Sequence, residues 1–231
     1  MFEPFGLTLS MLRNDPQYSY IHKFGSNLAL TGTPESIWSA GGLYPWSSLT
    51  TAQTLYVLST AGGDTGTLTI QGLDTNYDPL EETITLTGVT AVTTDNEFLR
   101  VFRMEYSDEN AGTITARVGS GTGTIVAQVD TGLAQTLMAV YTIPRQKTGF
   151  LMNYTASTGK GDDASVDLFV RDPAINGFRL KSETKVYQSS FRQEFTMPLV
   201  LQEKSDIDFR ATTTNANSDC ILNFDVVLLS N

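Results

Sequence analysis

SVDLFV, residues 165–170, alternates between core-forming apolar side chains and other side chains. Val166, Leu168 and Val170 share one face if this segment is extended, which is the two-residue period of a β-strand. Similar short segments recur at 67–71, 82–88, 98–104, 112–118, 124–129, 136–143, 149–156, 177–182, 194–201, 206–212 and 221–229. Turn-forming residues separate them at spacings typical of β-sandwiches and jelly rolls, so we expect an all-β fold.

The distribution of these segments predicts two β-sandwich or jelly-roll-like units, at residues 49–130 and 131–231. The glycine-rich sequence GSGTGT at 119–124 lies near their boundary and is typical of a turn or linker. Residues 1–48 are rich in aromatic side chains but show no sustained alternation. We therefore expect them to form an extended N-terminal arm that packs on its own chain or on a neighbouring subunit.

The composition disfavours several classes of function. The 231 residues carry a formal net charge of −10, which repels the phosphate backbone of nucleic acids. No apolar run approaches the ~20 residues that a membrane-spanning helix needs. The first residues lack the basic region of a signal peptide, so we expect the chain to be made and assembled in a cytoplasm.

Candidate catalytic groups are few. Cys220 is the one cysteine, which excludes an intramolecular disulfide and a thiolate metal cluster, and it lies on the apolar face of a predicted strand. His22 is the one histidine and lies far from Cys220 in the sequence. We expect a protein that is not an enzyme and that needs no cofactor.

One loop resembles a calcium site in its spacing. Asp74, Asn76 and Asp78 follow the i, i+2, i+4 pattern of calcium-binding loops, whose oxygen ligands suit this hard cation. Pro79 stands where such a loop needs glycine, and Thr85 stands where it needs an acid. An ordinary turn stabilised by the aspartate side chain is the favoured interpretation, with calcium binding as the alternative.

SIWSAGGLYPW, residues 36–46, contains both tryptophans of the chain. Trp38, Tyr44 and Trp46 could bury ~150–250 Å² each and attach the arm to a sandwich or to another subunit. Exposed rings could instead stack on the C–H faces of sugars. We predict an interface role for these three residues and for Tyr20 and Phe24.

Four segments together resemble a known family. YIHKFGSNLALTGTPESIWSAGGLYPW (20–46), IQGLDTNYDPLEETITLTGVTAV (70–92), FLRVFRM (98–104) and QTLMAVYTIPRQKTGFLMNY (135–154) are similar to virion structural proteins of tailed bacteriophages, cyanophages and other marine phages included. The resemblance implies a β-sandwich protein repeated in many copies in the virion. It carries over no catalytic residues.

From this resemblance we expect a homo-oligomer, with a trimer as one arrangement. Its partners would be further copies of itself and the major capsid protein or other virion proteins. The role expected is that of a capsid decoration or cement protein. Two alternatives remain open, namely a structural protein of the neck, tail or baseplate, and a receptor- or glycan-binding module.

Overall fold

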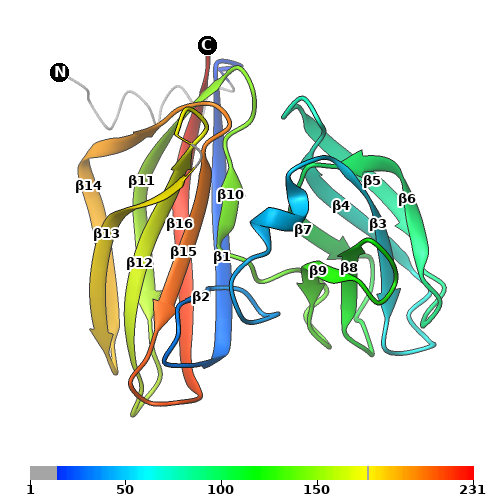
Figure 1. The fold of residues 1–231 in the computed structure, drawn as a ribbon. Helices are drawn as coiled ribbons and strands as arrows, with labels where there is room; N and C mark the ends of the chain where they lie inside the picture. The colour runs from blue at the N-terminus through cyan, green and yellow to red at the C-terminus, as the bar shows by residue number, and fades with distance from the viewer. Residues whose placement is uncertain (1–14, 176) are drawn as a thin grey trace.

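The computed structural model describes residues 15–175 and 177–231, and these residues confirm the all-β fold. Their strands form antiparallel sheets that face one another in two sandwiches (Figure 1). Within the described ranges, helical structure is confined to a short 3-10 turn, η1 (Trp46–Leu49). No helix there is long and apolar enough to span a membrane.

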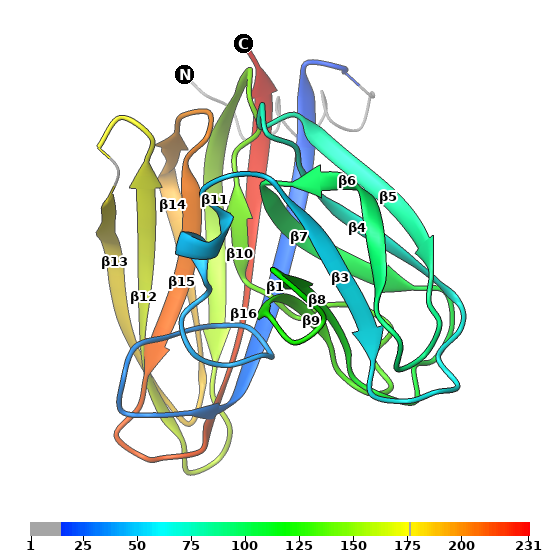
Figure 2. The ribbon, with the colours of Figure 1, turned by 45° about the vertical axis from the view of Figure 1, so that its right-hand side comes forward.

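The larger sandwich combines strands from both ends of the described chain (Figure 2). Its first sheet has the order β1 (Tyr18–Leu30), β16 (Ser218–Ser230), β11 (Lys147–Ser157) and β14 (Ser190–Leu201). Its second sheet has the order β10 (Val140–Thr142), β15 (Asp206–Thr212), β12 (Asp163–Asp172) and β13 (Gly177–Tyr187), and the short β2 (Glu35–Ser36) pairs with β15. We call this unit the terminal sandwich.

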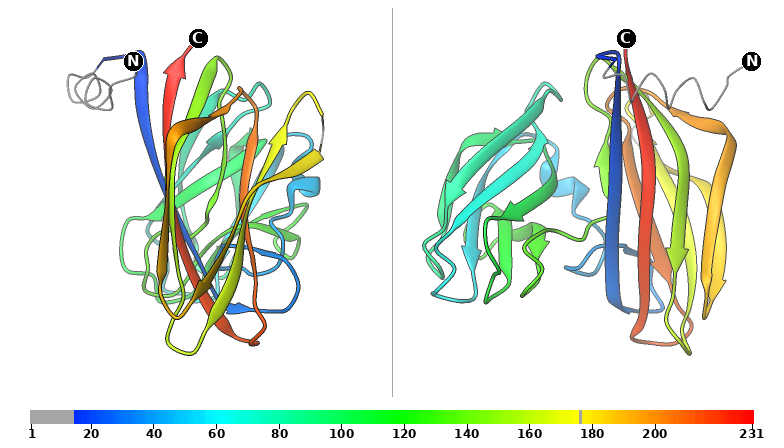
Figure 3. Two further views of the ribbon diagram at one scale, coloured as in Figure 1. Left: turned by 90° about the vertical axis from the view of Figure 1, so that its left-hand side faces the viewer. Right: turned by 180° about the vertical axis from the view of Figure 1, so that it is seen from behind.

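The smaller sandwich is inserted between β2 and β10. One sheet has the order β6 (Val92–Phe98), β3 (Gln53–Ser59), β8 (Ile114–Val118) and β9 (Thr124–Val129). The other has the order β5 (Pro79–Thr85), β4 (Thr67–Leu73) and β7 (Arg100–Tyr106). Seen from behind, this inserted sandwich lies beside β1 and β10 of the terminal sandwich (Figure 3).

The predicted N-terminal arm is wrong for residues 18–30, because they form β1, a full member of a sheet. β1 pairs antiparallel with β16 along its length, for example His22 with Asp225. Its alternation is hidden in the sequence because two of its buried positions hold Lys23 and Gly25 in place of apolar residues. Residues 1–14 of the predicted arm lie outside the described residues.

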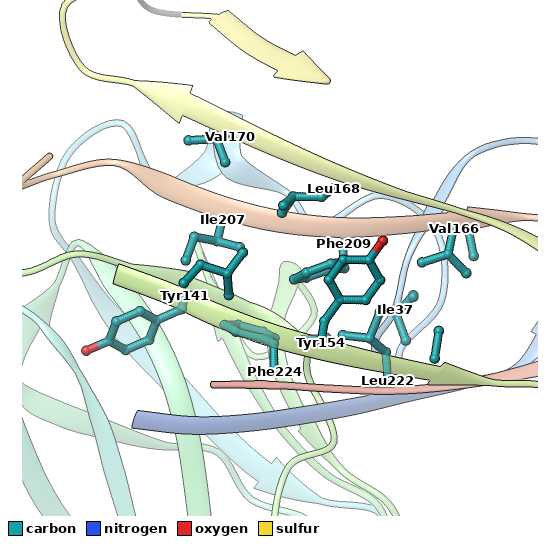
Figure 4. Packing of buried hydrophobic residues seen from close by; sticks show 14 of the residues in the cluster. Ile37, Tyr141, Tyr154, Val166, Leu168, Val170, Ile207, Phe209, Leu222 and Phe224 are labelled. Carbon is teal, nitrogen blue, oxygen red and sulfur yellow. The ribbon is translucent and has the colours of Figure 1, made fainter. Parts of the chain in front are cut away.

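Each sandwich has its own hydrophobic core. In the terminal sandwich, Tyr154, Phe209 and Phe224 stack at its centre, with ring centroids 5.1 Å apart for both Tyr154–Phe209 and Phe209–Phe224 (Figure 4). The second core lies between the sheets of the inserted sandwich and includes Leu68, Ile70 and Phe98. The alternating residues of β12 that predicted the fold point into the first core.

The two connections between the sandwiches run side by side. The chain leaves the terminal sandwich at Ile37, whose amide donates to Phe209 O at 2.8 Å. It returns at Ala139, whose amide donates to Ile37 O at 2.9 Å. Gly25 of β1 lies against this crossing, where a Cβ atom would come within 2.4 Å of both Ala139 N and Ile37 O. The close approach explains why this position is a glycine.

Candidate functional site

The aromatic residues of SIWSAGGLYPW form a buried cluster between the two sandwiches. Trp38, Tyr44 and Trp46 are 3%, 3% and 6% exposed. Tyr44 lies edge-on to both tryptophans, with centroids 5.2 Å from Trp38 and 4.6 Å from Trp46. Trp38 Nε1 donates to Gly42 O at 3.0 Å, and Trp46 Nε1 donates to Asp208 Oδ2 of β15 at 3.0 Å. The cluster therefore joins the two sandwiches within one chain.

For three of the five predicted interface residues, this burial agrees with attachment to a sandwich of the same chain and excludes the sugar-stacking alternative. Trp38, Tyr44 and Trp46 present almost no surface to a neighbouring subunit or to a sugar ring, because the inserted sandwich covers them. Tyr20 is 51% exposed and Phe24 is half-buried, and both lie on β1. The interface role stays a prediction for these two residues alone.

A buried ionic network lies next to the aromatic cluster. Asp206 of β15 accepts hydrogen bonds from Arg100 Nε at 2.9 Å, from Arg171 Nε at 2.7 Å and from the Thr142 hydroxyl at 2.5 Å. Arg100 belongs to the inserted sandwich and is 3% exposed, while Asp206 is 1% exposed. Burial alone would lower the pKa of Arg100, but the Asp206 carboxylate outweighs that effect and the pKa is raised. The guanidinium stays charged, and the ion pair connects the sandwiches.

Asp208, two residues further along β15, is also held from several sides. Its carboxylate accepts from Ser36 Oγ at 2.7 Å, from Trp46 Nε1 at 3.0 Å and from Arg210 Nε at 2.8 Å. Burial raises the pKa of Asp208, and Arg210 and the two neutral donors oppose that rise. We call Trp38, Tyr44, Trp46, Arg100, Arg171, Asp206 and Asp208 together the junction.

A cleft of about 760 Å³ opens on another side of the contact between the sandwiches. One wall is the first half of β1, from Ser19 to Phe24, and the opposite wall comes from β4, β5 and β7. Apolar side chains dominate the lining, Leu80, Phe102 and Tyr141 among them. A volume of this size is in the range of ligand-binding sites.

Lys23 lies in the wall of this cleft and is 4% exposed. Its ammonium group donates to Phe102 O, a backbone carbonyl of the inserted sandwich. Burial, and to a smaller extent the charge of the neighbouring Arg103, lower the pKa of Lys23 to about 7. No carboxylate of the described residues forms an ion pair with Lys23. A buried ammonium group whose partner is a backbone carbonyl is costly to keep charged, which is the physical cause of the lowered pKa.

The one histidine takes part in a surface hydrogen-bond group on β1 and β16. His22 Nδ1 lies 2.7 Å from Asp225 Oδ1, and the Tyr20 hydroxyl donates to the same carboxylate. Asn153 Nδ2 donates to Asp225 Oδ2 at 2.9 Å. Burial and the hydrogen bond to Asp225 raise the pKa of Tyr20 to about 12, so its hydroxyl stays protonated. The group orders the outer face of β1 without producing an activated nucleophile.

The calcium candidate forms the turn that we favoured over an ion site. Asp74 Oδ1 accepts the amides of Asn76 at 2.8 Å and Asp78 at 2.9 Å. Both carboxylate oxygens of Asp78 accept from Arg145, at 3.1 Å and 2.9 Å. Asp74 Oδ1 and both carboxylate oxygens of Asp78, three of the oxygens that a cation would need, are therefore engaged by hydrogen-bond donors. Within the described ranges, no group of three or more His, Cys, Asp or Glu side chains is placed to hold a metal ion.

Comparisons with known proteins add little to this geometry. No family model matches the chain, and no curated protein matches it. One solved structure with a low similarity is described as "Structure of infectious bursal disease virus Gt strain". It is 10% identical, and the match covers 99% of this chain and 83% of that one with a TM-score of 0.21. A TM-score at this level carries no argument about fold or function.

Proposed function

We propose that this protein is a structural component of a bacteriophage particle, and that it acts as a homo-oligomeric decoration or cement protein on the capsid. Its function would be to bind other subunits and to strengthen the shell. The proposal starts from the sequence resemblance to phage virion proteins. It gains support from the way in which the two sandwiches are joined.

The junction is the observation that carries the proposal. A decoration protein transmits force between neighbouring subunits, so its own domains must not move apart. Here Arg100, Asp206 and Trp46 are buried between the sandwiches and connect them by an ion pair and hydrogen bonds. Separation of the sandwiches would leave the buried charges of Arg100 and Asp206 without each other, which costs free energy. The junction is thus expected to hold the two sandwiches together as one rigid body.

Exposed apolar residues on β13 and β14 offer contact surface for neighbouring subunits. Leu180 is 50% exposed, Met197 is 82% exposed and Val200 is 59% exposed. These strands are the last in their respective sheets, at the side of the terminal sandwich remote from the inserted one (Figure 1). Exposed apolar residues at such an edge are typical of protein–protein contacts.

Immunogold labelling of intact phage particles tests the proposal. Antibody against this chain is expected to label the capsid surface in many copies. Label confined to the neck, tail or baseplate would exclude the decoration role and leave the alternative structural role. Particles without label, from a lysate that contains the protein, would contradict both.

The glycan-binding alternative has lost its proposed platform, because Trp38, Tyr44 and Trp46 are buried. A receptor-binding role would have to use other residues, of which Tyr20 is the most exposed of the predicted set. We therefore propose that the chain acts through contacts with other virion proteins.

A further inference from the structure

The first half of β1 has a free backbone edge that faces the cleft. β1 pairs with β16 on one side, and no second strand of the described chain pairs with it. The carbonyl oxygen of His22 accepts from Arg103 Nη2 at 3.2 Å, so it points away from β16 and toward the inserted sandwich. Because backbone groups alternate along a strand, those of Tyr20 and Phe24 point the same way. The edge can therefore accept a further strand.

The cleft beside this edge combines an apolar lining with cations that lack strong carboxylate partners, while the carboxylate in its lining, Glu81, accepts from Gln71 Nε2 at 2.9 Å. Lys23 donates to a carbonyl, and Lys147 Nζ donates to Ser230 Oγ at 2.7 Å. Arg103 has only a 3.3 Å contact with Glu105, whose side chain is 46% exposed. This combination of apolar side chains and cations favours an occupant that is mostly apolar and carries a carboxylate.

The chain contains a segment with this chemistry outside the described residues. In FGLTLSM, residues 5–11, Phe5, Leu7, Leu9 and Met11 alternate with small or polar residues, which is the pattern of a strand with one apolar face. Glu3 provides a carboxylate just before this pattern. We propose that residues 1–14 of a second copy of this chain bind in the cleft as an added strand on the free edge of β1.

The turn before β1 explains why the occupant comes from a second copy. Tyr18 N donates to Asp15 O at 3.0 Å, which makes Asp15–Pro16–Gln17–Tyr18 a tight turn. A short hairpin onto β1 would need a positive φ at the position of Pro16, or at the residue that follows the turn. Proline holds φ near −65°, and residues 16–18 are absent from the described residues that have positive φ. The turn at residues 15–18 therefore lacks the geometry of a short hairpin onto its own β1.

The proposal rests on the homo-oligomer of the proposed function and specifies its contact. Each copy would give its N-terminal segment and receive that of a neighbour, so the exchange closes in a symmetric dimer or ring. Main-chain hydrogen bonds along about six residues of β1 would supply affinity, and the cleft would select apolar side chains. Tyr20 and Phe24, the two predicted interface residues that stay accessible, would then belong to the interface.

Disulfide trapping between two separately made full-length variants tests this contact. One variant carries Leu7→Cys and the other carries Gln71→Cys, on the β4 wall of the cleft. The natural Cys220 does not interfere, because it is buried and burial raises the pKa of its thiol to about 12. Mixing and mild oxidation are expected to give a covalent dimer of the two variants. A synthetic peptide of residues 1–14 should reduce its yield at least several-fold.

The matched control pairs Leu7→Cys with Val89→Cys, which is 58% exposed between β5 and β6 and does not line the cleft. It should give a mixed dimer only at the level of random collision. An equal yield from the control pair would overturn the proposal. So would an intramolecular disulfide in a chain that carries both Leu7→Cys and Gln71→Cys, since the segment would then fill its own cleft.

Sedimentation of the unmodified chain separates this inference from the proposed function. If the unmodified chain forms an oligomer but the Leu7→Cys and Gln71→Cys variants give no mixed disulfide dimer, the exchange is refuted and the homo-oligomeric decoration protein is left intact. A chain that stays monomeric at all concentrations and is absent from particles would refute both. We expect the unmodified chain to sediment as an oligomer, and we expect the two cysteine variants to form the mixed disulfide dimer.

Discussion

Trp46 shows how one side chain can serve both sandwiches. Its ring packs on Tyr44 within the core of the inserted sandwich, and its indole N–H reaches Asp208 on β15 of the other. The guanidinium groups of Arg100 and Arg171 lie over the ring at 5.4 Å and 5.5 Å from its centroid. A residue with aromatic area, a donor and a cation-binding face is hard to replace at such a contact.

We expect Trp46→Phe to lower the free energy of unfolding by about 1–3 kcal/mol, because buried Asp208 loses a hydrogen-bond donor. Urea unfolding followed by circular dichroism measures this loss. Tyr187→Phe, at a side chain that is 62% exposed, serves as the control and should change stability by less than about 0.5 kcal/mol. Iodide should quench the tryptophan fluorescence of the folded protein only weakly, and strong quenching would contradict the burial of Trp38 and Trp46.

Lys23 gives stability a predictable dependence on pH. The pKa of Lys23 is about 7 in the folded chain and near 10.5 when unfolded, so between these values the unfolded state binds more protons. The free energy of unfolding should therefore rise with pH through this window because of Lys23. In Lys23→Met this rise should become smaller, as measured by urea unfolding at pH 7, 8, 9 and 10. Lys185→Met, at an exposed position, should leave the rise unchanged.

At the scale of single elements, the predicted strands agree best where one face enters a core. The segment 206–212 matches β15 in full, and 165–170 lies inside β12. β1 was not predicted as a strand because its inner face carries Lys23 and Gly25 in place of apolar residues. Both residues are explained only by contacts with residues that are distant in the sequence. Lys23 reaches Phe102 O, and Gly25 makes room for the crossing at Ile37 and Ala139.

β15 also shows why the junction could not be predicted from the sequence. Ile207 and Phe209 of DIDFRAT point into the core, so alternation assigns Asp206 and Asp208 to a solvent face. That face is covered, because η1 and the inserted sandwich pack on it through Trp46 and Arg100. A pattern within one strand contains no information about a second layer contributed by residues 106 and 162 positions away in the sequence.

Gly25→Ala should destabilise the protein by about 1–3 kcal/mol, because its new methyl group meets backbone atoms that cannot move without disturbing the crossing. Thermal unfolding measured by calorimetry checks this expectation. Gly63→Ala is the matched control, because a Cβ atom at Gly63 meets no atom within 4 Å. A Gly25→Ala variant as stable as the Gly63→Ala variant would show that β1 does not lie tightly against the crossing.

At the scale of the molecule, the described residues form two cores, and the junction couples them. Two separate cores would unfold independently if only a loose linker joined them. The junction opposes this, since separation of the sandwiches would leave Arg100 and Asp206 without each other. A second ion pair, Arg145–Asp78, also joins the sandwiches, but its side chains are 43% and 39% exposed. Water can replace that contact at little cost.

The two ion pairs thus make a matched test of how the sandwiches are coupled. Asp206→Asn leaves Arg100 and Arg171 buried without a carboxylate and should cost about 3–5 kcal/mol. It should also divide a single calorimetric transition into two, with hydrogen exchange rising in β3–β9 before β11–β16. Asp78→Asn removes the exposed pair and should cost less than about 1 kcal/mol while the single transition persists. Equal effects of the two substitutions would mean that burial of the junction does not couple the sandwiches, and the proposed decoration role would lose its structural support.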